Sequence, residues 1–168
     1  MDAGDQFIIS LTTDQEKILL CAKMMSLTEP WSIYGMDIDK SLQAFQGECK
    51  EVYLLERENQ VLGFAILQVC GTFKGYIQSL CVSEAYRGQG LGKMLLSFCE
   101  KRILKISPNI FICVSEFNKG AIKLYYEFGF TLVGELKDLI KKGNTELLLR
   151  KTYGSILGFQ SGSPNKEG

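Results

Sequence analysis

Hydrophobic and polar positions along this chain follow two different periods, and the alternation between them predicts a mixed α/β fold. Apolar residues at helical spacing predict a helix over residues 14–27, where Ile18, Leu19, Ala22 and Met25 fall on one side. The same spacing predicts a short second helix and two helices later in the chain. Their ranges are 37–45, 91–106 and 118–129.

Short apolar runs bounded by polar residues predict strands around these helices. Polar turns at residues 57–60 and 141–144 each join two runs into a hairpin. The expected strands cover residues 7–9, 52–56, 61–70, 76–82, 110–114, 131–139 and 146–151. This order predicts one domain over residues 1–153, followed by a mobile tail over residues 154–168 that is rich in glycine and polar residues.

A basic, glycine-rich turn over residues 82–93 is the most informative segment of the chain. It connects an apolar strand to the start of an amphipathic helix, where backbone N–H groups lack helical partners and the helix dipole favours negative charge. Glycines let a phosphate approach the backbone closely, and Arg87 and Lys93 add positive charge. The turn is therefore interpreted as an anion site; the alternative is a surface turn that caps a helix.

The spacing within this turn distinguishes among phosphate-binding motifs. A P-loop requires a hydroxyl residue after Gly-Lys, but Met94 follows Gly92 and Lys93 here. The glycine spacing also differs from the dinucleotide-binding fingerprint. What remains is Arg-x-x-Gly-x-Gly, formed by Arg87, Gly90 and Gly92. This pattern resembles the pyrophosphate-binding signature of the GNAT superfamily of acyl-CoA-dependent N-acyltransferases.

A second block of sequence strengthens the resemblance. Residues 118–130 begin with Asn118, a good helix N-cap, carry the pair Leu124 and Tyr125, and end with Gly129 before a phenylalanine. The two blocks, in this order, are similar to two motifs of the GNAT superfamily, and the resemblance extends over residues 5–152. The short stretch 30–32 is also weakly similar to ribosomal-protein N-terminal alanine acetyltransferases.

This resemblance implies the α/β GNAT fold, a mixed and mostly antiparallel sheet of about seven strands with about four helices. It implies an N-acetyltransferase in which an amine attacks acetyl-CoA directly in a ternary complex. Backbone groups of Leu80 and Cys81 would face the thioester carbonyl, and Tyr125 would protonate the departing thiolate as general acid. The implied acetyl-CoA-binding residues are Leu80, Cys81, Val82, Arg87, Gly88, Gln89, Gly90, Leu91, Gly92, Lys93, Asn118 and Tyr125.

The general base is where this chain departs from the family pattern. The positions at which many relatives carry a glutamate are occupied by Tyr76 and Cys113. Glu84 and Glu116 are nearby in sequence and are interpreted as solvated loop charges. A water chain is the remaining route for the proton. Its candidate relays are backbone carbonyls and the hydroxyls of Ser79 and Ser115.

The acceptor site is expected between the first two helices, their connecting loop and the closing hairpin. The candidate lining residues are Trp31, Tyr34, Asp37 and Asp39, although the tryptophan also suits a core and the aspartates also suit helix capping. The expected acceptor is a small-molecule amine or a protein N-terminus. The sequence leaves open whether the protein forms a homodimer. The alternative to an enzyme is a catalytically silent acyl-CoA-binding module that senses CoA or regulates a partner.

Composition excludes several other classes of protein. Lysine plus arginine and aspartate plus glutamate each number 19, so no general basic field exists for nucleic acid, and no apolar run has membrane-spanning length. The absence of histidine excludes His-based triads and His metal sites, and no metal is expected. The six scattered cysteines predict free thiols, and hence a reducing, cytoplasmic location.

Overall fold

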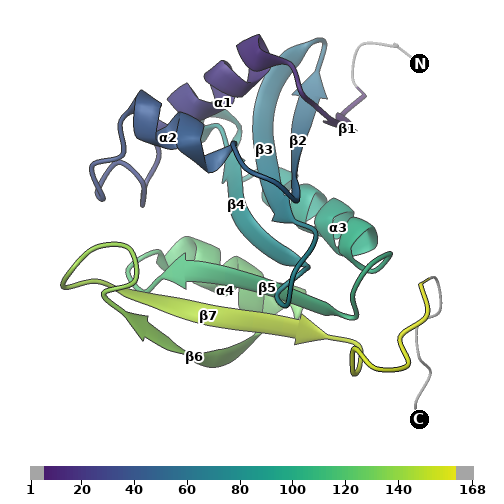
Figure 1. Cartoon of the computed structure of the whole chain (residues 1–168). Helices are drawn as coiled ribbons and strands as arrows, with labels where there is room; N and C mark the ends of the chain where they lie inside the picture. Colours follow the sequence, from purple (N-terminus) through teal and green to yellow (C-terminus); the bar gives the residue numbers. More distant parts are fainter. Residues whose placement is uncertain (1–5, 162–168) are drawn as a thin grey trace.

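The computed structural model describes residues 6–161 as a seven-stranded sheet with helices on both faces (Figure 1). The strand order is β1-β2-β3-β4-β5-β7-β6, and only the β4–β5 pair is parallel. The strands are β1 (Ile8–Leu11), β2 (Lys50–Arg57), β3 (Gln60–Gln68), β4 (Tyr76–Val82), β5 (Asn109–Ser115), β6 (Thr131–Lys137) and β7 (Thr145–Thr152). The helices are α1 (Gln15–Ser26), α2 (Ile38–Ala44), α3 (Leu91–Ile103) and α4 (Lys119–Phe128), with a 3₁₀ turn at Glu84–Tyr86. The predicted fold class is confirmed.

Local sequence signals fix where the helices begin and end. Asp14 accepts hydrogen bonds from the first free N–H groups of α1, and Asn118 does the same for α4. Gly129 ends α4 with a φ of 102°, a backbone conformation that glycine adopts without strain. The third helix is shorter than its periodicity predicts, because residues 104–106 form turns rather than a further helical turn.

Two hydrophobic clusters cover the two faces of the sheet. One packs α3 and α4 against it and includes Leu95, Ile103 and Leu149; the other packs α1 and α2 and includes Met25 and Phe64. The middle of β3 is apolar on both sides because it contributes to both clusters. The central strands are therefore held rigidly, which gives the adjacent site a fixed frame.

The sheet splays open between β4 and β5. These strands pair only at Tyr76–Phe111 and Ile77–Ile112, although β4 continues to Val82 and β5 continues to Ser115 (Figure 1). A bulge helps to turn β4 away, since the register with β3 skips Gln78. Beyond Ile77, the β5-facing backbone of β4 therefore lacks a ladder partner in β5, which leaves polar groups for a ligand.

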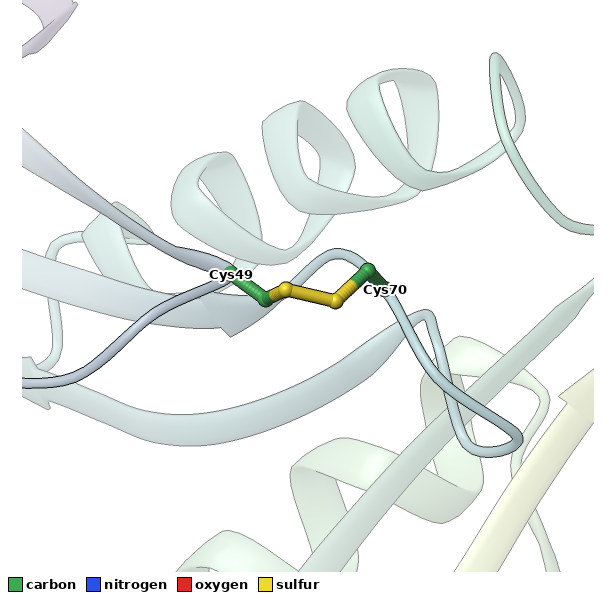
Figure 2. The surroundings of a disulfide bond; sticks show 2 residues. All are labelled: Cys49 and Cys70. Atoms are coloured by element: carbon green, nitrogen blue, oxygen red, sulfur yellow. A yellow bond between two sulfur atoms is a disulfide. The ribbon is translucent and has the colours of Figure 1, made fainter.

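The prediction of six free thiols is wrong for two cysteines. Cys49 and Cys70 form a disulfide, with Cα atoms 5.4 Å apart (Figure 2). Cys49 directly precedes β2 and Cys70 follows β3 closely, so antiparallel pairing brings together residues separated by 21 positions. The remaining cysteines, at positions 21, 81, 99 and 113, are free. The expected cytoplasmic location rested on six free thiols and loses part of that support.

Within residues 6–161, no helix is long and apolar enough to cross a membrane. The first part of the predicted tail, up to residue 161, consists of turns and bends with mostly exposed residues. The rest of that predicted tail lies outside the described residues.

Candidate active site

A cavity of about 730 Å³ lies where β4 and β5 separate. This volume falls within the range of about 300–1,000 Å³ that is usual for small-molecule and cofactor sites. Its lining comes from the strands on both sides, the turn before α3, the first half of α4 and the loop between α1 and α2. One cavity therefore contains both motifs found in the sequence.

One end of the cavity is formed by the glycine-rich turn and the start of α3. Gly90 precedes α3 with a φ of 80°, and a Cβ placed there would meet no atom within 4 Å. The first N–H groups of α3 are thus exposed to the cavity without a covering side chain. Arg87 and Lys93 line the same end, as do Gly88, Leu91 and Gly92, whereas Gln89 is not part of the lining.

The middle of the cavity is the splayed edge of β4. Leu80, Cys81 and Val82 all contribute to the lining, in the part of β4 that has separated from β5. The Cys81 thiol is buried and lies 3.8 Å from the Thr28 hydroxyl. Burial raises the pKa of Cys81 to about 11, so this thiol stays protonated and is a poor nucleophile at neutral pH.

Tyr125 reaches the cavity from α4. Its side chain is 6% exposed, and its ring packs against Phe130 at 5.9 Å between centroids. Burial raises the pKa of the Tyr125 hydroxyl above its ordinary value, so the group is a protonated donor throughout the neutral range. Asn118, which also lines the cavity, caps α4 by accepting a hydrogen bond from Ala121 N at 3.2 Å.

The two positions that lack the family's glutamate lie next to each other in the cavity. Both side chains, Tyr76 and Cys113, line the cavity, and burial raises the pKa of each. Neither is therefore a base at neutral pH. Glu84 and Glu116 are exposed and lie outside the lining, so the structure gives them no contact with the cavity.

Glu146 on β7 is a buried carboxylate in this cavity that the sequence analysis missed. Glu146 is 3% exposed and lies directly opposite Ser115 in the β5–β7 ladder. The Ser115 hydroxyl donates to Glu146 Oε1 at 2.7 Å, and the Tyr34 hydroxyl donates to the same oxygen. Sequence alone held no signal for this arrangement, because it requires knowing that β7 pairs with β5.

The acceptor-site candidates separate into two pairs. Trp31 and Tyr34 line the cavity, and the Tyr34 ring packs edge-on against Phe117 with centroids 5.9 Å apart. Burial, followed by the hydrogen bond to the Glu146 carboxylate, raises the pKa of Tyr34 to about 12. In the other pair, Asp37 is the N-cap of α2 and Asp39 lies in the first turn of that helix, and neither is part of the lining.

The arrangement combines a glycine-rich helix start, a strand edge without a partner in β5 and a protonated tyrosine in one cavity. A family model described as "Acetyltransferase (GNAT) family" matches residues 16–130, which is more than half of the chain. The chain belongs to this family of acetyltransferases. Among residues 6–161, no group of three or more histidine, cysteine, aspartate or glutamate side chains is arranged to hold a metal ion.

This GNAT chain is similar to a curated sequence and to several solved structures. An acetyltransferase from Yersinia pestis (strain Pestoides F) is 27% identical over 141 residues, covering 83% of this chain and 94% of that protein. The crystal structure of the ribosomal-protein-S18-alanine N-acetyltransferase from Escherichia coli has a TM-score of 0.72 and 18% identity, with 89% and 96% coverage. An aminoglycoside 6'-N-acetyltransferase complexed with coenzyme A has a TM-score of 0.69 and 15% identity, with 86% and 96% coverage. These two structural likenesses show the shared fold.

Proposed function

We propose that this GNAT protein transfers an acetyl group from acetyl-CoA to a primary amine. The observation that carries the proposal is the single cavity running from the Gly90 turn, along the free edge of β4, to the buried Tyr125 hydroxyl. Such a cavity matches a ligand with a pyrophosphate at one end, amide groups in the middle and a reactive thioester at the other. The coenzyme A bound to the aminoglycoside enzyme of the same fold supports this assignment.

Each part of the ligand has a complementary part in the cavity. The helix start with Arg87 and Lys93 suits the pyrophosphate, and the exposed edge of β4 suits the pantetheine amides by strand-like pairing. Backbone N–H groups near Leu80 and Cys81 would stabilise the oxyanion that forms at the thioester carbonyl. Tyr125 would then give its proton to the departing thiolate.

The transfer is proposed to be direct. The acceptor's nitrogen lone pair forms the new bond to the carbonyl carbon, and the carbon–sulfur bond breaks as the thiolate leaves. An acyl-cysteine intermediate is disfavoured because Cys81 remains a protonated thiol and the chain has no histidine to activate it. Both substrates must then be bound at once, in a ternary complex.

The acceptor must lose a proton before it attacks, and this requirement favours weakly basic amines. Presenting a lysine amine as the neutral form at pH 7 costs about 4 to 5 kcal/mol, from its reference pKa of about 10.4. A peptide α-amine costs only about 1 kcal/mol on the same basis. Protein N-termini and small amines are both proposed acceptors, and the Escherichia coli structure of the same fold is named as a ribosomal-protein-S18-alanine N-acetyltransferase.

The test is an acetyl transfer assay over a panel of amines. The purified protein is incubated with acetyl-CoA and each amine, and the release of the CoA thiol is measured together with the mass of the product. We expect amine-dependent thiol release and a product heavier by one acetyl group. Tight acetyl-CoA binding without transfer to any amine would contradict the proposal and favour a silent acyl-CoA-binding module.

A further inference from the structure

The acceptor end of the cavity contains a buried carboxylate with one oxygen already engaged. Tyr34 and Ser115 both donate to Glu146 Oε1, and the two hydroxyl oxygens lie only 2.6 Å apart. Neither hydroxyl bonds to Oε2. The two hydroxyls therefore fix the orientation of the carboxylate and leave its other oxygen for a cationic partner.

The rest of the acceptor end offers little negative charge. Among the lining residues, the only other carboxylate belongs to Glu29, which is exposed on the loop between α1 and α2. The β6–β7 loop at the entrance carries Lys141 and Lys142 against one carboxylate, Asp138, which accepts a hydrogen bond from Gly143 N, so positive charge is in excess on this loop. The Lys141 ammonium donates to the backbone oxygen of Ile33 at 3.2 Å and so connects this loop to the opposite side of the entrance. A second ammonium group on the acceptor would be repelled there.

Apolar side chains surround the same entrance. Ile33 from the α1–α2 loop and Leu139 and Ile140 from the β6–β7 loop are 44%, 55% and 53% exposed. Ile140 and Trp31 are part of the cavity lining itself. Exposed apolar side chains grouped around a cavity mouth are suited to covering an apolar part of a ligand.

We propose that the acceptor is an amine with a single positive charge on an apolar body, whose ammonium group docks on Glu146 Oε2 and gives its proton to that carboxylate. The apolar body lies against Trp31 and the isoleucines of the entrance. This inference rests on the proposed acetyl transfer and names the acceptor class of the same site. A peptide α-amine followed by apolar residues and a free arylalkylamine share this chemistry.

The proton and electron changes balance over the reaction. The ammonium nitrogen gives one proton to Glu146 Oε2, and its freed lone pair attacks the carbonyl carbon of acetyl-CoA. The carbon–sulfur bond breaks, its electron pair stays on sulfur, and the sulfur takes the Tyr125 proton. The new amide nitrogen loses a second proton, which restores Tyr125 through solvent, and Glu146 releases its proton to solvent.

The first experiment compares acceptors that differ only in charge. Butylamine and 1,4-diaminobutane have the same carbon chain, and the diamine carries a second ammonium group. We expect kcat/KM to be at least about tenfold higher for butylamine, and higher still for 2-phenylethylamine. An apolar peptide whose N-terminal ammonium group is its single positive charge forms a second arm, which distinguishes a protein acceptor from a small amine. A preference for the diamine or for spermidine would overturn the inference.

The second experiment replaces Glu146 by glutamine. The amide oxygen of Glu146→Gln still accepts from Tyr34 and Ser115, so the fold and the hydroxyl pair are retained, but an NH₂ group now faces the ammonium. We expect kcat/KM for the best acceptor to fall at least about 100-fold, with acetyl-CoA affinity within about twofold of the unsubstituted protein. Glu116→Gln is the matched control, because Glu116 is exposed and outside the cavity, and it should keep full activity.

The pH dependence separates proton transfer from a purely structural role. Tyr34, Tyr76 and Cys113 lie within electrostatic reach of Glu146, and burial raises the pKa of all three side chains. The exposed charge of Glu116 acts on Tyr34 from outside the cavity. The two tyrosines and the thiol therefore stay neutral between about pH 6.5 and about pH 8. The unsubstituted protein should show a flat kcat/KM over this range with butylamine. Glu146→Gln should show a rise of about tenfold per pH unit, because it uses only the neutral amine from solution.

The outcomes distinguish the two levels of the proposal. If acetyl-CoA binds but no amine is acetylated, the proposed function itself fails. If amines are acetylated but Glu146→Gln retains its rate or its flat pH profile, only the assignment of Glu146 fails. A folded Glu146→Asp variant that recovers part of the lost rate would support the carboxylate role, and no recovery together with a flat profile would contradict it.

Discussion

Replacement of Tyr125 by phenylalanine is the most direct test of the catalytic centre. The hydroxyl is the only group removed, and the ring keeps its packing against Phe130 and the surrounding core. We expect the free energy of unfolding to change by no more than about 1.5 kcal/mol, the usual range for one hydrogen-bonding group. A loss of rate would then report on proton donation rather than on folding.

The size of the loss follows from the acidity of the two groups. Burial raises the pKa of Tyr125 above its ordinary value of 10, whereas a thiol has a reference pKa of about 8.5. Full proton transfer to the thiolate is therefore uphill by at least about 2 kcal/mol, and the hydroxyl acts mainly as a donor to the developing charge. We expect Tyr125→Phe to lower kcat about 10- to 100-fold, in the lower part of the range for a general acid or just below it.

The assay measures CoA thiol release at saturating acetyl-CoA for the two proteins in parallel. Tyr126→Phe is the matched control, since this neighbouring tyrosine is 44% exposed and should be replaceable without loss. Because the raised pKa keeps Tyr125 protonated, the ratio of the two rates should stay constant from about pH 6.5 to about pH 9. A fully active Tyr125→Phe, or an equal loss in the control, would refute the assigned role.

Three further predictions follow from the site and the fold. Gly90→Asp should weaken acetyl-CoA binding at least about tenfold in calorimetry, whereas Gly158→Asp, which has a similar positive φ and equally open space, should leave binding unchanged. Thiol titration of the denatured protein should find four reactive thiols before reduction and six after it, and six thiols without reductant would disprove the disulfide. Reduction of the disulfide should lower the unfolding free energy by about 3 kcal/mol. Burial by itself would raise the pKa of Glu51, but the hydrogen bonds that Arg102 donates to this carboxylate lower the pKa overall. The pair therefore stabilises the fold above about pH 4.3, and this contribution is lost as the pH falls further. Arg102→Met should remove that part of the pH dependence of the unfolding free energy, and an unchanged pH profile would contradict this prediction.

Much of the fold could be predicted because its signals are local. The glycine turn before α3 and the capping residues Asp14, Asn118 and Gly129 act on backbone groups within a few positions of themselves. Hydrophobic periodicity fixed the type of each element, and the order of the elements with two short motifs was enough to indicate the family. The end of α3 and the lengths of the strands were less well predicted, because packing decides them.

The features that the sequence could not supply all depend on which distant segments become neighbours. Cys49 and Cys70 meet because β2 and β3 pair, and Glu146 becomes a site residue because β7 inserts between β5 and β6 and places it opposite Ser115. Asp37 has the right chemistry for an amine site but instead caps α2. The sequence by itself determined the glycine-rich turn proposed to bind the pyrophosphate and the tyrosine proposed as proton donor, since both arise within single short segments. Only the tertiary structure decided where the carboxylate lies, because burial and strand pairing are properties of the assembled sheet.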